Sequence, residues 1–76
     1  MENRLRELRL GCGMVLQELA VKAGTSTSML VAIEKYGHLP GRDLRERIAA
    51  ALGVAEAAIW PGLAREEEEA GRRRGG

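Results

Sequence analysis

The segment 23-AGTSTSMLVAIEKYG-37 decides the fold, because a glycine and four hydroxyl residues separate two stretches that repeat like helices. In the first stretch, the apolar positions with helical spacing are Leu16, Leu19, Ala20 and Ala23. In the second, Leu30 and Ile33 lie on one face, and Ser26 is a good N-cap. Gly24 permits a tight turn between the two, because glycine adopts a positive φ without steric cost. The segment therefore predicts two short helices joined by a turn, the second from about Ser26 to Lys35.

The chain before this unit also has helical periodicity. Leu5, Leu8 and Cys12 share one face of a first helix, for which Asn3 is the expected N-cap and Gly13 the expected stop. We interpret Cys12 as a small core residue of this helix. The alternative, a redox sensor, requires an exposed thiolate near positive charge.

Two more helices are predicted in the C-terminal half. A fourth begins at Gly41 or Asp43 and ends at Gly53, and its inward positions are Leu44, Ile48, Ala51 and Leu52. The segment 54-VAEAAIWPG-62 predicts a short fifth helix that Pro61 and Gly62 end. The predicted fold class is all-α: a compact five-helix bundle with a helix-turn-helix, in one domain over residues 1–63. Residues 64–76 are predicted to form a charged, disordered tail.

The composition argues against several classes of protein. With 76 residues and a net charge of +1, the chain makes one small domain without a strong overall attraction to nucleic acid or anionic membranes. No apolar run reaches the roughly 18 residues of a membrane span, so we expect a cytoplasmic protein. One cysteine and one histidine cannot form an internal disulfide or a structural zinc site. The only histidine that could activate the hydroxyls of residues 26–28 is His38, and its spacing from them does not suggest a catalytic triad. We therefore expect no enzymatic activity. We also expect no cofactor.

Two short helices joined by a glycine-containing turn form the unit that places its second helix in the major groove of DNA. Ala20 has a side chain small enough for the two helices to approach closely at Gly24. A plain helical hairpin has the same pattern, so these residues alone leave both interpretations open.

The wider pattern is more specific. The segments 4-RLRELRLGCGMVLQELAVKAGTSTSMLVAIEK-35 and 47-RIAAALGV-54 resemble the Cro- and phage-repressor-type helix-turn-helix family, also called XRE. The resemblance covers roughly residues 3 to 60, and its landmarks are Arg9, Gly13, Glu18 to Ala20, Ala23, Gly24, Ser26, Ile33, Glu34 and Ala51 to Val54. It implies a lambda-repressor-like DNA-binding domain that binds double-stranded DNA.

The resemblance also implies that Arg9 pairs with Glu34 and ties the first helix to the third. The residues are compatible with this, because Arg9 borders an apolar face and Glu34 follows Ile33, which is expected in the core. Two separate solvated charges are the alternative.

By the same resemblance, the third helix is the recognition helix, and Thr27, Ser28 and Ala32 occupy its base-reading positions. Family members commonly carry Gln, Arg, Asn or Lys there, which give bidentate readout. Thr27 and Ser28 can make only single hydrogen bonds, whereas Ala32, Val31 and Met29 can touch thymine methyl groups. Readout is therefore expected to depend on thymine methyls and DNA shape.

Before the second helix the sequence also departs from the family. Leu16 stands where the family often has a DNA-contacting glutamine, and Val15 where it has a capping Thr or Ser. Either the affinity for DNA is low, or this surface serves a protein partner.

Phosphate contacts are expected from polar and basic residues on one rim, although any one of them could equally be a solvated surface residue. The candidates are Ser26, Lys22, Lys35, His38 and Arg42, with Arg6 and Arg45 as further ones. Tyr36 either covers the end of the third helix or offers its hydroxyl to a phosphate.

The C-terminal part of the domain is the expected site of self-association. In phage-type repressors the end of the fourth helix and the fifth helix form a two-fold contact, which makes Ala55, Ala58 and Trp60 the candidate dimer seam. For Trp60, together with Ile59, sealing the core is the alternative. The expected function is that of a small transcriptional repressor that binds a two-fold-related operator as a homodimer, with a protein effector acting on it. The rival is a protein-interaction module of antitoxin or antirepressor type that keeps the fold without specific DNA readout.

Overall fold

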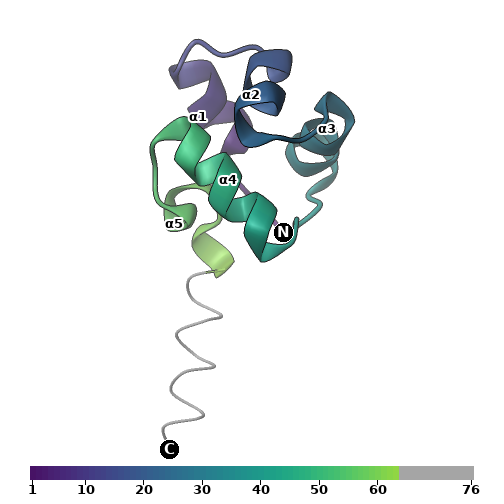
Figure 1. Cartoon of the computed structure of the whole chain (residues 1–76). Coiled ribbons are helices and arrows are strands. Elements are labelled where there is room, and N and C mark those ends of the chain that lie inside the picture. Colours follow the sequence, from purple (N-terminus) through teal and green to yellow (C-terminus); the bar gives the residue numbers. More distant parts are fainter. Residues whose placement is uncertain (64–76) are drawn as a thin grey trace, which may run out of the picture.

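Five helices, and a further helical turn that begins at Pro61, pack around one core in the computed structural model, which describes residues 1–63 (Figure 1). They are α1 (Leu5–Gly11), α2 (Leu16–Ala23), α3 (Thr27–Tyr36), α4 (Arg42–Leu52) and α5 (Glu56–Ile59). Within residues 1–63 there is no β-strand, which confirms the all-α fold class. In space, α4 packs against α2 and α5, while α3 packs against α1 and α2. The tail predicted for residues 64–76 lies outside the described residues.

The turn between α2 and α3 forms as its residues predict. Gly24 ends α2 in the left-handed conformation with φ 67°, which side chains with a Cβ adopt only at a cost. The amide of Thr25 then donates to the carbonyl of Ala20 at 2.9 Å, which closes the end of α2. Ser26 is the extended N-cap of α3, and its hydroxyl oxygen accepts from the amide of Met29 at 3.1 Å. The two caps, Gly24 and Ser26, and Thr25 between them thus fix the angle between the helices.

The core contains residues from all five helices. Its buried members are Leu5, Leu19, Ala20, Ala23, Leu30, Ile33, Ile48, Ala49, Leu52, Ile59 and Trp60. Leu8, Leu44 and Val54, for which the sequence pattern also predicts burial, are partly buried and pack against this cluster. Trp60 is fully buried, and it is the largest side chain among the core residues.

Three predictions near helix ends were wrong. Cys12 is exposed, because α1 ends at Gly11 and Cys12 is its C-cap rather than a further inward position. The N-cap of α1 is Arg4, whereas Asn3 accepts from the amide of Leu5 at 3.1 Å with its side-chain oxygen. Pro61 begins a further helical turn instead of ending α5, which stops at Ile59. Proline fits a first helical turn, where its missing N–H would have no partner.

Candidate nucleic-acid interface

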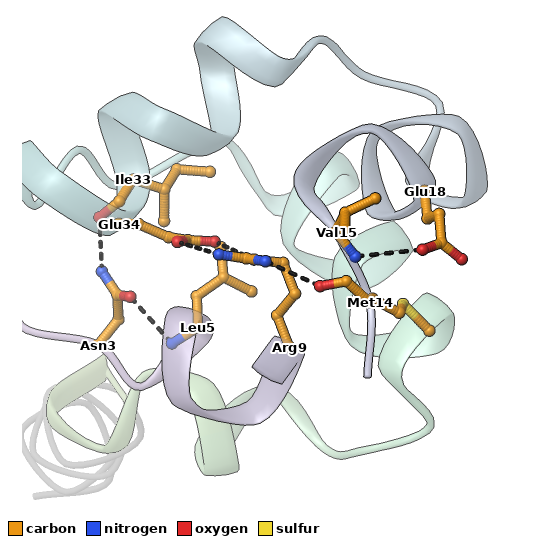
Figure 2. Close-up of polar contacts among 8 residues, drawn as sticks. All are labelled: Asn3, Leu5, Arg9, Met14, Val15, Glu18, Ile33 and Glu34. Carbon is orange, nitrogen blue, oxygen red and sulfur yellow. Dashed lines mark hydrogen bonds and ion pairs between the residues drawn. The ribbon is translucent and has the colours of Figure 1, made fainter. Parts of the chain in front are cut away.

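A buried ion pair fixes α3 against α1 (Figure 2). Arg9 donates from Nε to Glu34 Oε2 at 2.9 Å and from Nη2 to Glu34 Oε1 at 3.1 Å, which is a bidentate arrangement. The two side chains are only 9% and 6% exposed. The Nη1 atom of Arg9 donates to the carbonyl of Met14 at 2.8 Å, so the same guanidinium also holds the segment before α2. The alternative of two solvated charges does not describe this pair.

The electrostatics of this pair favour its charged form. Hydrogen bonding to Glu34 raises the pKa of Arg9 above its ordinary value, burial acts in the opposite direction, and the negative charge of Glu34 adds to the increase. The Arg9 guanidinium therefore stays charged and remains a fixed link between α1 and α3.

Asn3 makes a second link between α1 and α3 that the sequence did not reveal. Its Nδ2 atom donates to the carbonyl of Ile33 at 2.9 Å, while its Oδ1 atom accepts from the amide of Leu5 (Figure 2). One side chain thus joins the start of α1 to the second turn of α3. Only the preference of Asn for helix starts pointed to this position, and it did not indicate the partner on α3.

Arg47 makes a link at the turn, which sequence reasoning also missed. From α4, its Nη1 atom donates to the carbonyl of Ala23 at 3.0 Å and to the carbonyl of Gly24 at 2.8 Å. These carbonyls stand at the end of α2, where a helix leaves its last acceptors without partners. No side-chain pattern identifies such acceptors, because they belong to the backbone.

The start of α2 has half of a capping box. The amide of Val15 donates to the carboxylate of Glu18 at 3.2 Å. Because the side chain of Val15 has no acceptor, the reciprocal bond that Ser or Thr would make is missing. Val15 is 59% exposed and Leu16 is partly buried, so this end of α2 presents apolar surface.

The outward face of α3 consists mainly of small side chains. Thr27 and Ser28 are exposed in its first turn, and Val31 and Ala32 are half-buried one turn later. Met29 is also half-buried and packs against the core, which leaves it less available than the other four. The predicted base-reading positions therefore share an accessible face of α3, and this face has no long polar side chain near its start.

A surface hollow of about 400 Å³ lies beside this face. Its lining residues come from three helices: Arg6, Arg9, Leu16, Val31, Glu34 and Lys35. It brings the cations of Arg6 and Lys35 together with Val31, one of the four predicted base-contacting residues. The lining includes no other residue predicted to contact DNA.

The remaining predicted phosphate contacts differ in their availability. Lys22, Ser26, Lys35 and His38 are exposed, and Arg42 is exposed although it pairs with Glu46 at 3.3 Å. Arg45 does not fit its predicted role as a phosphate contact, because its side chain is only 13% exposed. It donates to Glu56 at 3.2 Å and to the carbonyl of Pro40 at 3.0 Å, so it joins α4 to α5 and to the loop before α4 instead of facing DNA.

Of the three residues predicted for the dimer seam, two have exposed surface and one does not. Ala55 is exposed and Ala58 is half-buried, which leaves both with surface that another molecule can contact. Trp60 is fully buried within its own chain, so its side chain has no surface left for a seam. Of the two interpretations of Trp60, the structure has the one in which it seals the core.

Residues 1–63 contain no group of three or more His, Cys, Asp or Glu side chains that could hold a metal ion. None of the helices described by the structure is long and apolar enough to span a membrane.

Comparison with known proteins gives a single family assignment. No protein-family model matches the chain. An uncharacterized HTH-type transcriptional regulator of Methanothermobacter thermautotrophicus is 38% identical over 53 residues, which make up 70% of this chain and 77% of that protein. An identity of this level over most of both proteins, together with the two-helix turn unit described above, identifies the family. The chain belongs to the helix-turn-helix transcriptional regulators.

Proposed function

We propose that this protein binds double-stranded DNA as an XRE-type transcriptional regulator, with α3 in the major groove. The observation that carries the proposal is the hollow in which Arg6 and Lys35, from two helices, flank Val31 on the outward face of α3. Cations that line a groove-facing helix attract phosphates, while the helix itself meets the bases. The buried pair of Arg9 and Glu34 supports the proposal, because it holds α1 and α3 in one fixed arrangement.

Base readout in this proposal is permissive. Thr27 and Ser28 each contribute one hydrogen bond, and Val31 and Ala32 contact thymine methyl groups. Much of the specificity then comes from the shape of the DNA, which depends on sequence without a base contact. This agrees with the small side chains on α3.

Phosphate contacts come from the rim of the same face. Lys35 and Arg6 line the hollow, and Lys22, His38 and Arg42 extend the rim. Ser26 joins them, because its oxygen accepts from Met29 and its hydroxyl proton remains free to donate. Each neutralised phosphate releases counterions, so the affinity falls steeply with salt.

The separation of phosphate and base contacts predicts two kinds of variant. Lys35→Ala weakens binding to every duplex alike. It also makes the negative slope of log affinity against log salt shallower by about 0.9, the value for one phosphate contact. Ser28→Ala leaves that slope unchanged and lowers the preference at one base pair by about fivefold, as expected for one hydrogen bond. Fluorescence anisotropy on a panel of duplexes with single base-pair changes measures both quantities.

Arg4→Ala is the charge-matched control for Lys35→Ala. Arg4 is the exposed N-cap of α1, and its side chain pairs only with Glu7, at 2.8 Å, among the described residues. Its removal is expected to leave the slope as it is. The proposed division of roles is wrong if Lys35→Ala and Ser28→Ala have the same effect on every duplex.

The regulator acts in this proposal as a homodimeric repressor in the cytoplasm, without a cofactor or catalytic activity. A dimer places two copies of α3 about one DNA turn apart, which matches a two-fold-related operator. Ala55 and Ala58 are the residues of the seam, and a protein effector would act on the dimer. Repression follows from occupancy of promoter DNA.

A second candidate is the protein-interaction module of antitoxin or antirepressor type. It is favoured by one observation, the apolar surface on α2. Val15 and Val21 are 59% and 76% exposed and line a hollow together with Gln17, Glu18 and Lys22. Exposed apolar surface of this kind is typical of protein contacts. Selection of DNA from a random pool separates the two candidates.

A further inference from the structure

Arg47 lies on α4, which packs against α2, and its side chain ends at the turn before α3. We infer that Arg47 is a positioning residue: it sets the start of α3 for base readout and does not contact DNA itself. The inference rests on the proposed function and adds to it a residue that determines specificity from behind the recognition helix.

The contacts of Arg47 concentrate on the last acceptors of α2. One nitrogen, Nη1, serves both the Ala23 carbonyl at 3.0 Å and the Gly24 carbonyl at 2.8 Å. A helix C-terminus carries partial negative charge, so a guanidinium there is favoured by the dipole as well as by the hydrogen bonds. Only Thr25 and Ser26 separate Gly24 from the first residue of α3. We call these two hydrogen bonds of Arg47, to the carbonyls of Ala23 and Gly24, the clamp. The clamp therefore acts close to Ser26, the N-cap of the proposed recognition helix.

The other side of the guanidinium is held as well. The Nε atom of Arg47 lies 3.1 Å from Asp43 Oδ2, one turn earlier on α4. The arginine thus extends along α4 to the turn, where Nη1 donates to two backbone acceptors. Because Nη1 is engaged by the turn and Nε lies beside Asp43, the position of the guanidinium is set by contacts within the protein.

The clamp and the buried ion pair have different tasks. Arg9 and Glu34 are nearly dry and hold the later turns of α3, so they contribute to the stability of the fold. The Arg47 side chain is 44% exposed and that of Asp43 is 86% exposed, so the ion pair between them contributes little to stability. The hydrogen bonds of Arg47 to the carbonyls of Ala23 and Gly24 instead hold the turn just before the first turn of α3, where Thr27 and Ser28 lie. Small shifts there misalign single hydrogen bonds to bases, because such contacts tolerate about 0.5 Å.

The test compares Arg47→Ala and Arg47→Lys with Arg4→Ala, which removes the same charge from an exposed pair at the start of α1. For each variant, anisotropy titrations over a range of salt concentrations measure binding to the selected operator and to random duplex, and thermal unfolding gives Tm. We expect Arg47→Ala to lose about three- to tenfold in operator affinity, with random-duplex affinity and salt slope unchanged. Arg47→Lys restores part of the loss, since an ammonium group can donate to one carbonyl. Arg4→Ala binds like the wild-type protein.

Two results would overturn the inference. A salt slope that falls by about 0.9 in Arg47→Ala, with equal losses on all duplexes, identifies Arg47 as a phosphate contact. A lower Tm with unchanged operator affinity far below that temperature identifies it as a purely structural residue.

Amide hydrogen exchange tests the contacts of Arg47 in the protein without DNA, so its result does not depend on the proposed function. A wild-type protein that binds no duplex refutes the proposed function, but exchange still reports on the clamp. Arg47→Ala should then speed exchange at the amides of Thr25 and Met29, which close the turn and cap α3. Unchanged exchange at both amides means that Arg47 does not hold the start of α3.

Discussion

At the scale of single residues, two nearly dry charges lie between α1 and α3 in a domain whose other buried residues are apolar. Arg9 contacts Glu34 on α3 and the Met14 carbonyl before α2, so one guanidinium joins three segments of the chain. Taking charges out of water is costly, and that cost is offset only while every partner is present. The packing of α1 against α3 is therefore sensitive to the loss of either partner.

Removal of one partner is expected to be severe. Glu34→Ala leaves the Arg9 guanidinium buried without its carboxylate, which should lower the free energy of unfolding by about 3–5 kcal/mol. Urea denaturation followed by circular dichroism measures the change. Glu7→Ala is the control, because it removes an exposed carboxylate whose pKa is lowered by the hydrogen bond and charge of Arg4, and its effect should be near zero. Equal shifts of the two denaturation midpoints would contradict a structural role for the buried pair.

The residues that sequence reasoning missed share a physical reason. Arg9 and Glu34 could be paired from the resemblance, because both partners are side chains. Asn3 and Arg47 bind backbone carbonyls, at Ile33 and at the end of α2. Every residue except proline offers the same backbone donor and acceptor, so the letters of the sequence do not distinguish these acceptors.

At the scale of elements, the turn between α2 and α3 determines how α3, the proposed recognition helix, is presented. The sequence predicted this turn because glycine favours the left-handed end of a helix and serine favours the N-cap, and Gly24 and Ser26 stand at these two positions. The end of α1 and the end of α5 were less predictable, because these helices are short and have few periodic positions. Cys12 fitted the period of α1 although the helix had already ended at Gly11.

Two glycines provide a matched test of the turn. Gly24 and Gly53 both end helices in the left-handed conformation, with φ 67° and 69°. A Cβ at Gly24 would lie 2.9 Å from Arg47 Nη1, whereas a Cβ at Gly53 meets nothing within 4 Å. Each change to alanine should lower the free energy of unfolding by about 1 kcal/mol through the backbone conformation.

Only Gly24→Ala should also weaken DNA binding, because it displaces the guanidinium that holds the turn. Denaturation curves and operator titrations of the two variants measure the two effects separately. If Gly53→Ala weakens operator binding as much as Gly24→Ala does, the loss follows from general destabilisation and the turn has no special role.

At the scale of the whole molecule, the proposed function divides the surface into a DNA face and regions available to other proteins. The net charge of +1 gives little overall attraction to DNA, so the proposed binding depends on cations gathered at one face, such as Arg6 and Lys35. The burial of Trp60 limits the proposed seam to small side chains, Ala55 and Ala58, which favours weak self-association that DNA strengthens. The sequence could not decide this, because a lone tryptophan near a helix end is equally compatible with a core and with an interface.

The most direct test of the account is selection from a pool of random duplex DNA, followed by titration of the winning sequence against salt. We predict enrichment of a pseudo-palindrome with half-sites about 10 base pairs apart, bound with an affinity that falls steeply as salt rises. Such a result establishes a DNA-reading α3 and a two-fold complex together. The absence of any enriched sequence at low salt, where attraction to phosphate is strongest, would contradict the account and direct attention to a protein partner for α2 and α3.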